Sequence, residues 1–102
     1  MSYKTIQRQT CITENGWNHS EYRGYGNGSF QRVEIVINEN EESSEIAAVY
    51  HWNITNGWLF VLSLPIGSTP AAAVLPIESD ANVMLLEETA DLLFSQARKI
   101  LR

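Results

Sequence analysis

The sequence predicts an α+β fold: an antiparallel β-meander of about five strands with one C-terminal amphipathic helix packed on one face. Two observations carry this prediction. Asn-Gly pairs recur at residues 15–16, 27–28 and 56–57, between segments rich in β-branched and aromatic residues. Asn-Gly suits the type I′ turn that joins paired strands. Residues 79–102 instead repeat apolar side chains at intervals of three and four, which is the period of a helix.

The length and composition fit one globular domain over residues 1–102. Hydrophobic residues make up 44% of the chain and charged residues 19%, so the chain can bury a modest core. We therefore expect no domain boundary within it.

The strand-forming segments are separated by turn-forming or polar residues. A polar, acidic stretch at 39–44 follows the third segment and reads as a solvated loop. The five expected strands are Tyr3 to Glu14, Trp17 to Gly26, Ser29 to Asn38, Glu45 to Thr55 and Trp58 to Leu64.

Prolines punctuate the chain after the last strand. Residues 68–73 fit a short helical turn, with Thr69 as N-cap and Pro70 at the first helical position. Alternatively, Ala72 to Ile77 is an edge strand that tolerates Pro76. The sequence leaves open whether Ala71 to Ile77 is strand or short helix.

The C-terminal segment has the capping and charge pattern of a helix. Ser79 or Asp80 can cap its start, and Arg98 and Lys99 lie near its end, where they favour the macrodipole. Its expected apolar stripe is Val83, Leu86, Ala90, Leu93, Ala97 and Ile100.

Two-residue Asn-Gly turns would fix the register of the whole sheet. They place Ile54 opposite Leu59 and Trp52 opposite Val61. The face expected beneath the helix then holds mostly apolar residues: Cys11, Tyr22, Val33, Ile35, Ile37, Ile46, Ala48, Tyr50, Trp52, Ile54, Leu59 and Val61.

The opposite face is expected to be charged over the first three strands and apolar over the last two. A strand that is apolar at every position, such as 58–62, is typical of burial on both faces. One helix can cover only one face, so a second copy, a partner, the Pro-rich segment or barrel closure must cover the other. The expected partner-binding residues are Trp58, Phe60, Leu62, Leu64 and Val49.

A polar group on the same expected face has two interpretations. It can be a site for an anionic or amide-bearing ligand, or a cross-strand charge ladder that only stabilises the sheet. The second is the more common arrangement. The candidate ligand-binding residues are Arg32, Glu34, His51, Arg23 and Tyr25.

The remaining functional classes find little support in the sequence. A net charge of −5, with only 7 Lys and Arg, argues against nucleic-acid binding. The expected register separates His19 from His51 and points Cys11 away from His19, so we expect no metal site, no cofactor and no catalytic dyad. A single cysteine, no signal-peptide pattern and no long apolar run favour a cytoplasmic protein without a membrane span.

The sequence thus predicts a non-enzymatic module that binds a protein partner or a second copy through the apolar part of the open sheet face. The alternative is a small-ligand binding domain that uses the polar and aromatic residues of that face.

Overall fold

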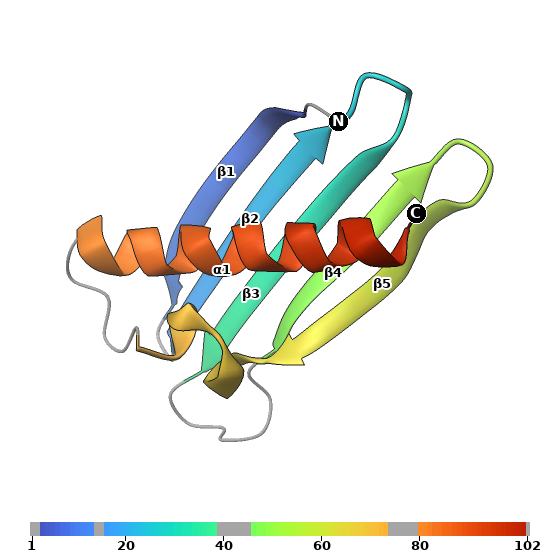
Figure 1. The fold of residues 1–102 in the computed structure, drawn as a ribbon. Coiled ribbons are helices and arrows are strands. Elements are labelled where there is room, and N and C mark those ends of the chain that lie inside the picture. Colours follow the sequence, from blue (N-terminus) through green and yellow to red (C-terminus); the bar gives the residue numbers. More distant parts are fainter. Residues whose placement is uncertain (1–2, 14–15, 39–45, 74–79, 102) are drawn as a thin grey trace.

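The computed structural model describes residues 3–13, 16–38, 46–73 and 80–101 (Figure 1). Five antiparallel strands form one sheet in chain order, so every strand pairs with its neighbours in sequence. The strands are β1 (Lys4–Thr13), β2 (Gly16–Gly24), β3 (Phe30–Asn38), β4 (Ile46–Asn53) and β5 (Gly57–Pro65).

One long helix, α1 (Asp80–Ile100), crosses the strands obliquely on one side of this sheet (Figure 1). It begins on the β1 side and ends over β4 and β5. The predicted α+β meander with a single C-terminal helix is therefore confirmed. No helix in the described part of the chain is both long and apolar enough to cross a bilayer.

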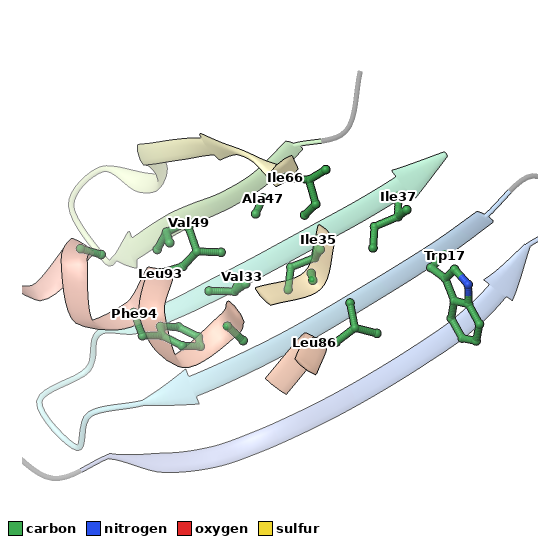
Figure 2. Packing of buried hydrophobic residues seen from close by; sticks show 13 residues of the cluster. Trp17, Val33, Ile35, Ile37, Ala47, Val49, Ile66, Leu86, Leu93 and Phe94 are labelled. Atoms are coloured by element: carbon green, nitrogen blue, oxygen red, sulfur yellow. The ribbon is translucent and has the colours of Figure 1, made fainter. Parts of the chain in front are cut away.

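The core lies between α1 and the sheet. Leu93 and Phe94 project from α1 among Val33 and Val49, while Ile66 lies beside Ala47 near one end of the sheet (Figure 2). All of these side chains are buried. The helix is held mainly by this apolar contact, since burying one such side chain contributes roughly 1.5–3 kcal/mol.

The apolar stripe of α1 is close to the predicted one, with two differences. Leu86, Ala90, Leu93 and Ala97 are buried and Val83 is partly buried, but Ile100 is 60% exposed. Phe94, which the stripe omitted, has no exposed surface. Seven residues of an α-helix complete slightly less than two full turns. Residues spaced by a seven-residue repeat therefore shift gradually around the helix, and over five turns the buried face moves away from the predicted stripe.

The predicted hairpin register is wrong because none of the described turns is a two-residue Asn-Gly turn. Trp52 pairs with Trp58 rather than Val61, and Ile54 lies in the turn rather than opposite Leu59. A type I′ turn needs positive φ at both central positions, and among the described residues only glycines have it.

The β4–β5 connection is a three-residue turn, Ile54 to Asn56, closed by Gly57 at φ +68°. The Asn53 side chain accepts hydrogen bonds from the backbone N–H groups of Thr55 (3.1 Å) and Asn56 (2.8 Å). This Asx arrangement, followed by a left-handed glycine, is typical of three-residue hairpins.

The β2–β3 connection is longer, from Tyr25 to Ser29. Gly26 and Gly28 have φ of +76° and +85°, and the Asn27 side chain accepts hydrogen bonds from the N–H and hydroxyl of Ser29. The five-residue connection leaves Gly24 opposite Phe30.

These turns change which residues face α1. The pairing on either side of β3 is one residue out of step with the prediction, and a slip of one residue moves every side chain of a strand to the other face. Val33, Ile35 and Ile37 lie beneath α1 as predicted. In β1, β2 and β4, by contrast, the side chains lie on the face opposite to the predicted one. In addition to Ile54, which lies in the turn, the residues wrongly placed beneath the helix include Cys11, Tyr22, Ala48, Tyr50 and Trp52.

A β-bulge divides β5, at the shift between Val49 and Tyr50 of its partner strand. Phe60 pairs with Tyr50 on the side away from α1, but Leu62 pairs with Val49 beneath α1. The extra residue of a bulge shifts the alternation of side chains by one. Even-numbered residues of β5 therefore face away from α1 before the bulge and toward α1 after it.

Two short 3-10 helices follow β5, at Ile66–Ser68 and Pro70–Ala73. The helical-turn alternative is confirmed for 70–73, while residues 74–77 of the edge-strand alternative lie outside the described residues. The Thr69 hydroxyl donates to the carbonyl of Ile66 (2.7 Å), and Thr89 of α1 accepts the N–H of Ala71 (2.8 Å). The second contact anchors this segment to α1.

Candidate functional site

The open face is the side of the sheet opposite α1. No described element lies over it (Figure 1). Two neighbouring cross-strand rows there carry an aromatic patch, because residues directly opposite in antiparallel strands share a face. One row is Phe30, Trp52 and Trp58, and the next is Tyr22, Arg32, Tyr50 and Phe60.

The six aromatic rings of this patch form three pairs, of which Tyr22 with Trp58 and Tyr50 with Phe60 are edge to face and Phe30 with Trp52 is tilted. Ring centroids are 5.6 Å apart for Phe30 and Trp52, and 5.8 Å apart for Tyr50 and Phe60. Phe60 nevertheless remains 58% exposed and Trp58 42%. The patch thus combines aromatic ring contacts with a large apolar area that remains in contact with water.

Arg32 lies at the centre of the aromatic patch. Its guanidinium carbon is 4.7 Å from the ring centroid of Tyr50 and 5.1 Å from that of Trp58, both within cation–π range. Glu34 is its ion-pair partner at 3.7 Å, too long for a hydrogen bond. Among the described residues, the buried Nε of Arg32 has no hydrogen-bond partner.

The five expected partner-binding residues are divided between the two sides of the sheet. Trp58 and Phe60 lie on the open face as predicted. Val49 is fully buried beneath α1, and Leu62 and Leu64 pack against that core. Their expected place on the open face is wrong, because the bulge and the slip of β4 turn them inward.

The five expected ligand-binding residues are also divided. Arg32 and Glu34 lie on the open face, whereas His51 pairs with Gln31 on the helix side and Arg23 is buried there. The charge ladder across Arg23, Arg32 and His51 does not form, since Arg32 pairs with Tyr22 and Tyr50.

Glu21 and Arg23 instead belong to an ion-pair network beneath α1. Glu21 has no exposed surface and accepts hydrogen bonds from Arg8 (2.5 Å) and Arg23 (2.6 Å). Arg23 also donates to Asp91 of α1, and its guanidinium lies 3.9 Å from each of the ring centroids of Tyr3 and Phe94. The network ties β1, β2 and α1 together.

His19 is fully buried beside this network. Its Nδ1 and the Thr10 hydroxyl share a hydrogen bond of 2.7 Å, and its Nε2 has no partner among the described residues. Burial lowers the pKa of His19, and Arg8 acts in the same direction against the opposing charges of Glu21 and Glu87. The ring is therefore neutral near pH 7.

A cavity of about 350 Å³ lies on the helix side, where the C-terminal end of α1 passes over the end of the sheet. The β2–β3 connection forms one wall through Tyr25, Asn27 and Ser29. The strands contribute Gln31 and His51, and α1 contributes Arg98 and Leu101.

Two of the candidate ligand-binding residues, Tyr25 and His51, line the cavity. The other lining residues, such as Gln31 and Arg98, were not predicted as ligand-binding residues from the sequence. The Tyr25 hydroxyl donates to Gln31 Oε1 at 2.6 Å. Burial raises the pKa of Tyr25, although the charges of Arg23 and Arg98 oppose this. Arg98 was expected only as a favourable charge at the helix end; nothing in its spacing revealed the cavity.

Tyr22, Tyr50 and Trp52 are the aromatic patch residues that the sequence placed on the wrong face. Their alternation along β2 and β4 was visible, but the two-residue turns chosen for these hairpins reversed it. Cys11, expected to be buried, is exposed on the open face opposite Asn18. Within the described residues, no three His, Cys, Asp or Glu side chains gather as metal ligands.

Comparison with known proteins found no matching family model, no matching curated protein and no matching solved structure.

Proposed function

We propose that this chain is a non-enzymatic interaction module whose open face packs against the open face of a second copy. The observation that carries the proposal is the exposed aromatic patch, in which Phe60 and Trp58 are the most exposed rings. Exposed apolar patches bordered by polar residues are typical of protein–protein contacts, and tryptophan and tyrosine are enriched at their energetic centres.

The size of the open face supports a dimer. Five strands of eight to ten residues cover a footprint of roughly 700 Å², taking about 4.8 Å between strands and 3.4 Å per residue. A standard interface buries about 800 Å² on each partner. Two such faces can therefore form one interface of ordinary size.

The charges of the open face favour a second copy as its occupant. The whole chain carries −5, yet the centre of this face holds one cation, Arg32, and one anion, Glu34. A two-fold axis brings Arg32 of one copy toward Glu34 of the other, so the surface is complementary to itself. The loose 3.7 Å pairing within one chain leaves both groups able to form these contacts.

The test compares two adjacent residues of β5 by light scattering after size exclusion. The side chain of Phe60 (58% exposed) lies on the open face. Leu59 (46% exposed) pairs with His51, and its side chain lies on the helix side. Phe60→Glu is expected to give a folded monomer, with the dissociation constant raised about 30-fold or more, as for an aromatic hot-spot residue of an interface. Leu59→Glu is the matched control and is expected to remain dimeric.

Circular dichroism establishes that both variants are folded. A wild-type protein that stays monomeric at about 100 μM, where weak dimers still form, would contradict the proposal. Equal loss of association in the two variants would show that the open face has no special role.

A further inference from the structure

We propose that the cavity beneath the C-terminal end of α1 binds a small organic carboxylate, with Arg98 as the cation that recognises it. This site is on the opposite side of the sheet from the aromatic patch, and the inference is independent of self-association.

The cavity has the dimensions of a small-molecule site. Its volume of about 350 Å³ lies at the lower end of the range for ligand pockets, roughly 300–1,000 Å³. The Tyr25 ring and Leu101 give it apolar walls, and a few polar groups converge on it. A ligand with a short apolar body and one polar end suits this lining.

The charge of the cavity selects an anion. Arg98 lines it, no Asp or Glu does, and Arg98 has no ion-pair partner among the described residues. Arg23, the other cation near Tyr25, is neutralised by Glu21 and Asp91. A guanidinium presents two parallel N–H groups, which match the two oxygens of a carboxylate.

The neutral groups of the cavity can complete the recognition. The Tyr25 hydroxyl donates to Gln31 Oε1 (2.6 Å), so the remaining polar group of the Gln31 side chain is its amide nitrogen, a hydrogen-bond donor. His51 also lines the cavity, and its Nδ1 has no hydrogen-bond partner among the described residues. The Gln31 amide is a donor type that suits a carboxylate oxygen, and His51 becomes a second donor in the tautomer that carries the proton on Nδ1.

The position of the cavity favours a carboxylate over a phosphate. It lies at the C-terminal end of α1, where the unpaired carbonyl groups carry partial negative charge. Binding a doubly charged phosphate with one arginine against that field is unfavourable, whereas a singly charged carboxylate is balanced by Arg98 alone.

Benzoate and benzamide are matched probes, because they have the same shape and differ in charge. Calorimetry and amide chemical-shift titration of the full chain are expected to show saturable binding of benzoate, with shifts at residues 25–31, 51 and 98–101. Benzamide and inorganic phosphate are expected to bind at least about tenfold more weakly, a difference of 1.4 kcal/mol.

Two exposed cations of α1 give matched variants. Arg98→Gln is expected to weaken benzoate binding about tenfold or more, while Lys99→Gln, the same change one residue along, leaves it unchanged. Phe60→Glu is expected to bind benzoate normally, which separates this site from the aromatic patch.

Equal affinities for benzoate and benzamide, or equal effects of the Arg98 and Lys99 changes, would overturn the assignment. So would the absence of a saturable shift at about 10 mM benzoate, well above a millimolar dissociation constant. Tighter binding of phosphate would reject the carboxylate in favour of another anion.

Discussion

Glu21 lies between two arginines on the side of the sheet that faces α1, and all of its surface is withdrawn from water. Charges in that position are tolerated only while they are paired. The face beneath α1 is therefore part apolar core and part ionic network.

Loss of the Glu21 charge is expected to be costly. Glu21→Gln leaves Arg8 and Arg23 without their shared carboxylate, and breaking a buried pair costs about 3–5 kcal/mol. Glu87→Gln removes a half-exposed partner of Arg8 at 3.7 Å and should cost less than about 1 kcal/mol. Urea titrations of the two variants test this, and similar midpoints would contradict the buried network.

His19 predicts a pH dependence of stability. Because burial lowers its pKa in the folded state, the unfolded chain takes up a proton at higher pH than the folded chain does. Its contribution is fully present above about pH 6.5, the unfolded value. As pH falls below that value toward the lowered folded-state pKa, stability should decrease by up to about 1.4 kcal/mol per pH unit.

The measurement is urea unfolding across this pH range for the wild type and for His19→Gln, which keeps a group that can hydrogen-bond Thr10. The variant should lose this part of the slope, and NMR should show His19 titrating below pH 6.5. Identical slopes in the two proteins would refute the prediction.

At the scale of elements, the sequence predicted which segments become strands and helix and the order of the strands, but not the register in which they pair. β-branched runs and the apolar stripe depend on local patterns, and all five strands and α1 agree with them within a few residues. Register depends on turn geometry. Asn56-Gly57 contributes one left-handed glycine to a three-residue turn, which is locally as acceptable as a two-residue turn.

The same uncertainty limited the prediction of the sites. Because β2 and β4 were reversed, the prediction placed Tyr22, Tyr50 and Trp52, half of the aromatic patch, beneath the helix, and placed the core residue Val49 on the open face. The binary pattern could not correct this, because β2 presents His19, Glu21 and Arg23 to the core. Polar residues in the core are the case in which pattern-based assignment fails.

The drift of the buried face along α1 gives a test at this scale. Leu93→Ala removes a fully buried side chain and should cost about 2–5 kcal/mol. Ile100→Ala, in the same sequence stripe but 60% exposed, should change stability by less than about 0.5 kcal/mol. Denaturant midpoints decide between them, and equal losses would mean that the C-terminal turn of α1 packs as tightly as its centre.

At the scale of the whole molecule, one sheet separates two surfaces of different character. α1, the ionic network and the cavity occupy one side, and the aromatic patch occupies the other (Figure 1). Since the two share only the backbone of the strands, changes on one side should leave the other largely intact.

The proposed two-fold contact predicts a charge-reversal rescue. Arg32→Glu gives a face with two anions and Glu34→Arg a face with two cations, so each variant alone should self-associate at least about tenfold more weakly. An equimolar mixture should recover association as a heterodimer, measured by light scattering. Failure of the mixture to associate while both variants remain folded would argue against the isologous arrangement.

The position of α1 after every strand has a consequence for biosynthesis. Chains leave the ribosome from the N-terminus, so Val33, Ile35 and Val49 are made before the helix that covers them. Until residues 80–100 emerge, the nascent sheet has an apolar surface on each side. A ribosome stalled ahead of Asp80 would therefore carry an aggregation-prone nascent chain with exposed apolar surface, which is the kind of chain that chaperones bind.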